Sequence, residues 1–182
     1  MAQATTLHSF AVQLADMDRA VYADFELRVA QQSSETAEFM LVRVLAYCLE
    51  YTEGIALTEG VAAVDAPAVW VRDLTGQVTA WIEVGAPDAE RVHRGSKLAG
   101  RTAVYAHRDP QPLLALYAGR RIHRAAEIPV YSFERGFLGA AAAHLQRRSR
   151  LAVSVTERQL YLDIDGHSLG SAITEQRAGL SP

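Results

Sequence analysis

The amino-acid sequence predicts one α/β domain: a mixed β-sheet flanked by helices, with an extra hairpin at the N-terminus and a β-meander at the C-terminus. Three observations lead to this prediction. The chain has 182 residues, a length typical of a single domain. Segments with helical apolar spacing alternate along the chain with segments of strand periodicity. No linker, internal repeat or low-complexity tract separates them, so we expect residues 1–182 to form one domain.

The first three elements follow from local patterns. Residues 5–14 and 23–30 alternate polar and apolar side chains and are rich in β-branched or aromatic residues, which is typical of strands. The polar link DMDR between them favours a turn, so we expect an antiparallel pair. Either serine of the pair 33–34 is a suitable N-cap for a helix over residues 35–51, and Glu35 would lie at the positive end of the helix dipole.

A hairpin is predicted in the middle of the chain. A short strand starts at residue 55, and residues 69–73 and 78–84 flank the turn sequence LTGQ. With a two-residue turn at the TG of this sequence, Trp70 lies opposite Trp81 as a cross-strand aromatic pair. The remaining elements are a helix over 88–99, a strand over 102–107, a helix over 110–118, a strand near 128–133, a helix near 134–146 and three terminal strands.

Composition limits where and how the protein works. No apolar run reaches the roughly 18 residues of a membrane-spanning helix. The N-terminus lacks a basic start followed by an apolar stretch, so we expect no secretory signal. Cys48 is the one cysteine of the sequence and lies among apolar residues, which favours a small buried side chain. We therefore expect a cytoplasmic protein with no membrane partner.

Basic charge is distributed unevenly along the chain. The net charge of −3 excludes a uniformly basic coat for nucleic acid. Two arginine-rich clusters nevertheless stand out, one over residues 120–124 and one over residues 147–150. Either could contact phosphates, which dominate the affinity of proteins for nucleic acid. The alternative is ordinary solvated surface charge.

Three carboxylates are candidates for a metal site. In the predicted hairpin, residue 68 lies opposite Glu83, and Asp65 follows just beyond it in the incoming loop. Asp65 and Glu83 are therefore the expected ligands of a hard divalent cation such as Mg²⁺. Glu38 lies one turn into the first helix, on the apolar face that we expect to pack on the sheet. It could supply a third carboxylate.

Each of these acids also has a structural interpretation. Glu38 could pair with an arginine on the helix surface, and Asp65 could serve as a turn residue. Glu83 ends an apolar strand, where an unpaired charge is costly, so we expect it to be part of a site or of a polar network. The sequence contains no glycine-rich phosphate loop, no GxSxG motif and no Cys/His zinc pattern.

The same residues resemble a known family. Over residues 35–107 the predicted order is helix, three strands, helix and strand, which is the order of the core of the restriction-endonuclease-like, or PD-(D/E)XK, nuclease superfamily. The sequence resembles the YaeQ proteins of proteobacteria, and this resemblance extends along the whole chain. Its motifs are SETAE at residues 34–38, DAPAVW at residues 65–70 and WIEVGAPD at residues 81–88. Phe39 stands where the family often has arginine.

The resemblance implies a nuclease-like fold and a metal-dependent phosphodiesterase ancestry. Two positions depart from the nuclease motif, since Ala68 replaces an aspartate and Gly85 replaces a lysine. Some nucleases of this fold carry the basic group on the following helix. Lys97 could therefore replace the missing lysine and stabilise charge that develops on phosphate. Arg91 and Arg94 on the same helix would then contact the substrate.

Three functions follow from these features. The leading hypothesis is a nuclease-like protein that cuts or binds nucleic acid, with Mg²⁺ held by Asp65 and Glu83 and assisted by Glu38 and Lys97. The second is a catalytically inactive module that binds nucleic acid or protein on the same fold. The third is a metal-dependent hydrolase of a smaller phosphorylated substrate. Open, clustered carboxylates would favour an enzyme, whereas buried carboxylates paired with arginine would favour the module.

Overall fold

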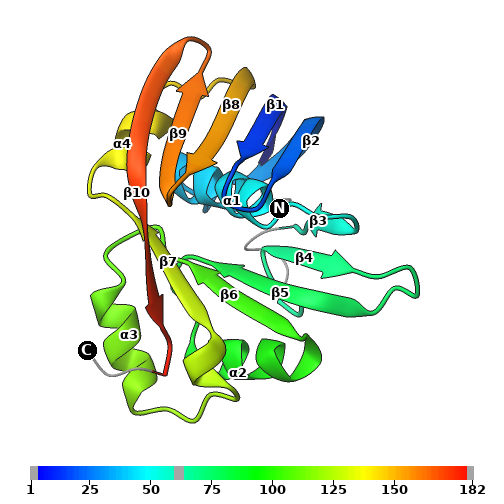
Figure 1. The fold of residues 1–182 in the computed structure, drawn as a ribbon, viewed down its shortest axis with the longest axis vertical. Coiled ribbons are helices and arrows are strands. Elements are labelled where there is room, and N and C mark those ends of the chain that lie inside the picture. The colour runs from blue at the N-terminus through cyan, green and yellow to red at the C-terminus, as the bar shows by residue number, and fades with distance from the viewer. Residues whose placement is uncertain (1–3, 60–63, 180–182) are drawn as a thin grey trace.

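The structure is a computed structural model that describes residues 4–59 and 64–179. The described part of the chain forms one ten-stranded mixed sheet in the order β2-β1-β8-β9-β10-β7-β6-β5-β4-β3 (Figure 1). The strands are β1 (Thr5–Asp16), β2 (Val21–Gln32), β3 (Ile55–Leu57), β4 (Val69–Arg72), β5 (Val78–Val84), β6 (Arg101–Tyr105), β7 (Pro129–Phe133), β8 (Arg148–Thr156), β9 (Gln159–Ile164) and β10 (His167–Arg177). The helices are α1 (Ala37–Leu49), α2 (Ala89–Leu98), α3 (Gln111–Ala118), α4 (Phe137–Ala142) and a 3₁₀ helix, η2 (Ala125–Glu127).

The long strand β10 joins two halves of this sheet. Its residues 167–172 pair with β9 and its residues 173–177 pair with β7, antiparallel in both cases. The two halves bend around α1, so the sheet is nearly barrel-shaped, with α1 inside it (Figure 1). None of the described helices is long and apolar enough to cross a membrane.

Alternation along the strands separates an inner from an outer face. Inward side chains of both halves pack with α1 in the main core, among them Phe10, Leu151 and Ile82. On the outer face, α2 and α3 cover β5, β6 and β7 through a second, smaller core. The outer face of β1, β2, β8 and β9 carries no helix in Figure 1. Its outward side chains are therefore open to solvent.

A buried arginine connects the two ends of the sheet. Arg43 of α1 has a fully buried side chain and forms an ion pair with Glu35 at 3.0 Å. Its Nη1 donates to the carbonyl of Ala30 in β2 at 3.1 Å, and its Nη2 donates to the carbonyl of Thr58, which follows β3, at 3.0 Å. Strands β2 and β3 are the two edges of the sheet. Arg43 thus links the two edge strands, which would have to pair with each other for the sheet to close into a barrel.

Most predicted elements are confirmed. The order helix, three strands, helix and strand over residues 35–107 is present, and Trp70 pairs with Trp81 in the predicted register. The strand predicted from residue 55 is β3, and residue 60 lies outside the described residues. Cys48 is buried, as predicted, and burial raises the pKa of its thiol to about 12.

Three local predictions were wrong. The hairpin turn spans residues 73–77 rather than two residues, and a bulge at the end of β4 keeps the predicted register. The N-cap of α1 is Thr36 rather than Ser33 or Ser34, because the Thr36 hydroxyl accepts a hydrogen bond from the Phe39 amide at 3.1 Å. Glu35 therefore precedes the helix and pairs with Arg43 instead of lying in its first turn. The helix expected near residues 134–146 is shorter, since α4 covers only Phe137–Ala142.

Candidate functional site

Glu83 lies in a buried polar network between β5 and α2. The Trp81 indole donates to Glu83 Oε1 at 2.7 Å, and Arg91 Nε donates to the same oxygen at 2.8 Å. The Glu83 side chain is only 4% exposed. Burial raises the pKa of Glu83, and the nearby charge of Arg91 opposes that rise. The network predicted for Glu83 is thus present, with an arginine as its charged partner.

The sequence around α2 explains how this network is positioned. Asp88 caps α2 by accepting a hydrogen bond from the Arg91 amide at 2.7 Å. Gly95 lets the helix approach the sheet, because a Cβ atom there would lie 2.4 Å from Cδ1 of Trp81. The Arg91 guanidinium also donates to the carbonyls of Val64 and Ala66. One arginine therefore holds both the carboxylate of β5 and the loop before β4.

Asp65 lies in this loop but points into solvent. Its side chain is 89% exposed and lies 3.6 Å from Arg94 of α2. The structure thus gathers Asp65, Glu83, Arg91 and Arg94, and it pairs each carboxylate with an arginine. Such an exposed pair contributes at most about 1 kcal/mol.

Glu38 and Lys97 lie elsewhere. Ile82 of β5 packs in the core that contains α1, whereas the neighbouring Glu83 faces α2 on the other side of the sheet. Glu38 belongs to α1, so Glu38 and Glu83 lie on opposite sides of the sheet. Glu38 lines a separate cavity of about 620 Å³ with His107 and Glu134. Lys97 is exposed in the last turn of α2, about 9 Å along the helix axis from Arg91.

The arrangement does not fit a preformed magnesium site. Among the described residues, no three His, Cys, Asp or Glu side chains come together in a geometry that could hold a metal ion. A cation at Glu83 Oε1 would have to displace Arg91 and Trp81. The metal and catalytic roles of Asp65, Glu83, Glu38 and Lys97 therefore stay predictions.

A second candidate site is a groove on the open outer face, which we call the arginine groove. It has a volume of about 840 Å³. Ser9 of β1 pairs with Arg28 of β2 on one side and with Arg148 of β8 on the other, and Ala11 pairs with Arg150 two residues further along. The residues that line the groove include Arg28, Arg147, Arg148, Arg150, Glu26 and Asp165.

The four arginines of this groove lack acidic partners. None of their side chains forms an ion pair within residues 4–59 and 64–179, although eight other arginines do. The two nearby acids have other partners, since Glu26 accepts from the Ser9 hydroxyl at 3.5 Å and Asp165 accepts from the backbone amide of Arg150 at 2.8 Å. The groove thus offers four guanidinium groups that form no ion pair within the described residues, against two carboxylates, although the backbone amide and the charge of Arg150 both help to lower the pKa of Asp165.

Sequence reasoning named part of this groove and missed the rest. The cluster over residues 147–150 is visible in the sequence, but Arg28 lies far from it along the chain. Only the parallel pairing of β1 with β8 brings them together. No local pattern marks that pairing.

Fold and site together define a class of protein. It is a mixed α/β protein in which an open, nearly barrel-shaped sheet surrounds α1, and an ion pair between the buried Glu83 and the partly exposed Arg91 holds α2 on the outer face. The family model described as YaeQ protein matches residues 1–173. This chain therefore belongs to the YaeQ family, as its motifs indicated.

Solved structures and sequence relatives agree with this assignment. The crystal structure of the YaeQ protein from Pseudomonas syringae superposes with a TM-score of 0.86 at 29% identity, covering 96% of this chain and 97% of the other. The YaeQ protein from Xanthomonas axonopodis pv. citri gives a TM-score of 0.86 at 28% identity, covering 95% and 98%. YaeQ from Escherichia coli K12, described as uncharacterized, is 26% identical over 175 residues, which cover 96% of this chain and 97% of the relative.

Proposed function

We propose that this protein binds nucleic acid through the arginine groove and acts as a binding module on a nuclease-like scaffold. The observation that carries the proposal is the set of four arginines around one groove, none of which forms an ion pair in the part of the chain that the structure describes. Because phosphate contacts supply most of the affinity of such proteins, free guanidinium groups on an open sheet face are suited to a phosphate backbone.

The spacing of the arginines supports this proposal. Arg148 and Arg150 lie two residues apart on the same face of β8, about 6.6 Å along the strand. Arg28 lies two strands away from Arg148, about 9.6 Å across the sheet. The groups are close enough to contact neighbouring phosphates of one strand, and rigid strands fix their separation.

The element order over residues 35–107 supports a nuclease-like ancestry. Strands β3, β4 and β5 form an antiparallel meander, and β6 runs parallel to β5 after α2. This is the order expected of the PD-(D/E)XK core. The buried pair between Glu83 and Arg91 favours a module that binds without cutting, because the carboxylate expected to hold a metal is already engaged.

A metal-dependent phosphodiesterase is the second candidate. The observation that favours it is the proximity of Asp65 to the Arg91–Glu83 pair, since the loop carrying Asp65 is held by the same guanidinium. Release of Arg91 on binding substrate would be required to open the site. Loss of cleavage in Glu83→Gln, with binding retained, would establish this function.

Fluorescence anisotropy with labelled 20-nucleotide DNA and RNA tests the proposal. The double variant Arg148→Gln/Arg150→Gln removes two charges from the groove, and Arg120→Gln/Arg121→Gln removes two exposed charges elsewhere as a matched control. We expect only the groove variant to bind weakly and to show a shallower dependence of log K on log salt, by about 1.4 for a single strand. Equal losses in both variants, or no binding by wild type, would contradict the proposal.

A further inference from the structure

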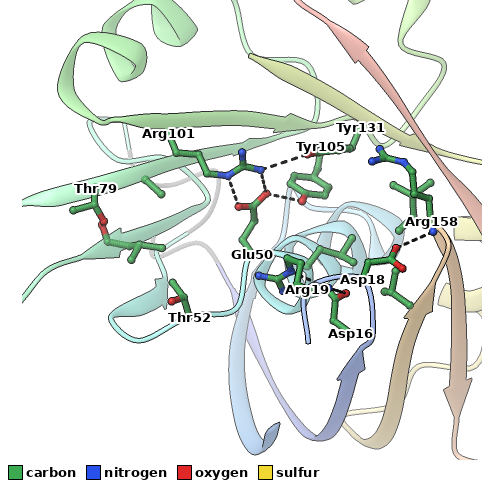
Figure 2. Close-up of a pocket in the computed structure, with 15 residues that line it drawn as sticks. Asp16, Asp18, Arg19, Glu50, Thr52, Thr79, Arg101, Tyr105, Tyr131 and Arg158 are labelled. Atoms are coloured by element: carbon green, nitrogen blue, oxygen red, sulfur yellow. Dashed lines mark hydrogen bonds and ion pairs between the residues drawn. The ribbon is translucent and has the colours of Figure 1, made fainter. Parts of the chain in front are cut away.

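A cavity remains inside the sheet where α1 ends. Helix α1 stops at Leu49, while both halves of the sheet continue beyond it and enclose about 510 Å³ (Figure 2). This volume lies within the range of small-molecule sites. Its apolar wall comes from both halves of the sheet: Val71 and Ala80 of β4 and β5, and Val155 and Ile173 of β8 and β10.

The carboxylates of this cavity are already satisfied. Glu50 accepts two hydrogen bonds from Arg101, at 2.7 and 2.8 Å, and one from the Tyr105 hydroxyl at 2.7 Å. Asp18 accepts from the backbone amides of Glu157 and Arg158, at 2.7 and 2.8 Å. Asp16 pairs with Arg19 at 2.7 Å. A cationic ligand would therefore find no carboxylate without a partner.

Two of the three cationic side chains of the cavity, in contrast, keep free donors within the described residues. Arg158 uses Nη2 to pair with Glu175 at 2.7 Å, and within the described residues its Nε and Nη1 have no acceptor. Arg101 uses Nε and Nη2, which leaves its Nη1 without a partner in the same part of the chain. Both side chains are about half exposed, at 53% and 46%, and both line the cavity (Figure 2).

We propose that this cavity binds a small organic anion. Its carboxylate, sulfonate or phosphate group would accept hydrogen bonds from the free donors of Arg158, and its apolar or aromatic body would lie against Val71, Ala80 and Val155. Charge-assisted hydrogen bonds of this kind are among the stronger ones in proteins. The site is separate from the arginine groove, because it opens on the inner face of the sheet.

Titration with 8-anilinonaphthalene-1-sulfonate tests the proposal, since this probe joins an anionic group to an aromatic body. Glu175 pairs with both Arg158 and Arg177, but only Arg158 lines the cavity. Arg158→Gln and Arg177→Gln therefore each leave Glu175 with one arginine, which makes the second variant a matched control. We expect wild type to bind one equivalent of probe, Arg158→Gln to weaken binding about tenfold, and Arg177→Gln to leave it unchanged.

Two further measurements separate the cavity from nonspecific binding. The uncharged analogue N-phenyl-1-naphthylamine should bind wild type and Arg158→Gln equally, because it lacks the sulfonate. Ala80→Leu should weaken binding of both probes, because the larger side chain would project into the cavity against their aromatic body. Any of three results would overturn the proposal. These are equal weakening in Arg158→Gln and Arg177→Gln, unchanged binding of the sulfonate probe to Arg158→Gln, and no binding by wild type.

Discussion

Arg91 and Glu83 form a 2.8 Å ion pair in which the carboxylate is buried and the guanidinium also holds the backbone of loop 64–66. The pair connects β5, α2 and the loop before β4 through a single side chain. The carboxylate of Glu83, which the sequence predicted to be a metal ligand, is therefore at the centre of a stabilising network.

Removal of Arg91 should be strongly destabilising. In Arg91→Ala, Glu83 stays in a site that excludes water and loses its charged partner, so we expect a loss of about 3 kcal/mol in the free energy of unfolding. Urea denaturation measures this change. Glu83→Gln keeps a hydrogen-bond acceptor and should lose less. A loss below 0.5 kcal/mol, on the order of an exposed substitution, would show that the pair is not a structural element.

The free energy of unfolding should depend on pH through the ionisation of Glu83. Burial raises the pKa of Glu83 above its ordinary value of 4.5. Its contribution to stability is therefore complete below that ordinary value and is lost as the pH rises through the pKa of the folded state. The difference in unfolding free energy between wild type and Glu83→Gln should fall as the pH rises from 4 toward neutrality. An opposite slope would mean that Arg91 outweighs burial.

Removal of one partner of the buried Arg43–Glu35 pair should destabilise the protein more than removal of both. Arg43→Met leaves Glu35 unpaired and two edge carbonyls without their donor, so we expect a loss of about 3–5 kcal/mol. The double variant Arg43→Met/Glu35→Leu should recover part of this loss, because no buried charge remains. Chemical denaturation of the double variant and of the two single variants, Arg43→Met and Glu35→Leu, measures the coupling free energy. Additive losses would contradict it.

Packing of α2 on the sheet should depend on Gly95. A methyl group at this position would overlap the Trp81 ring, so Gly95→Ala should destabilise the protein by about 2 kcal/mol. Gly119→Ala is the control, since nothing lies within 4 Å of a Cβ atom there and the backbone φ is −96°. Thermal unfolding of the two variants should separate them. Equal melting temperatures would show that α2 can move away from β5.

Magnesium and manganese should bind weakly to the isolated protein. Arg91 and Trp81 occupy the carboxylate oxygen that a cation would need, and the nearby Asp65 side chain points into solvent and pairs with Arg94. Calorimetric titration should therefore show no saturable heat with wild type. Binding that is present in wild type and absent in Glu83→Gln would restore the catalytic hypothesis.

Local features of the fold were predictable from the sequence, and long-range ones were not. The Trp70–Trp81 pair was predicted correctly, but not the turn behind it: residues 73–77 separate the two strands, and a bulge between Val71 and Arg72 keeps the predicted register. The Asp88 cap follows from the residues beside it. The parallel pairing of β1 with β8 depends on strands more than 130 residues apart, and local periodicity carries no information about it. The sequence therefore suggested a separate hairpin and meander where the structure has one continuous sheet.

In the candidate site, too, single residues could be predicted from the sequence but their long-range contacts could not. Glu83 and Arg91 were both named from the sequence, but their ion pair was not, because the pattern alone does not show which way a side chain turns on a packed helix. Glu38 was placed near Glu83 because it lies on the face of the first helix that was expected to pack on the sheet. The structure has the two side chains on opposite sides of the sheet. Arg28 could be found only after the sheet order was known.

Electrophoresis of end-labelled 20-nucleotide DNA and RNA, incubated with wild-type protein and Mn²⁺, tests most directly whether the protein binds nucleic acid without cutting it. Native gels report binding and denaturing gels of the same samples report cleavage. We predict retarded bands of full-length oligonucleotide with wild type and with Glu83→Gln, and no retardation with Arg148→Gln/Arg150→Gln. Fragments that appear with wild type and disappear with Glu83→Gln would contradict this conclusion and identify a nuclease.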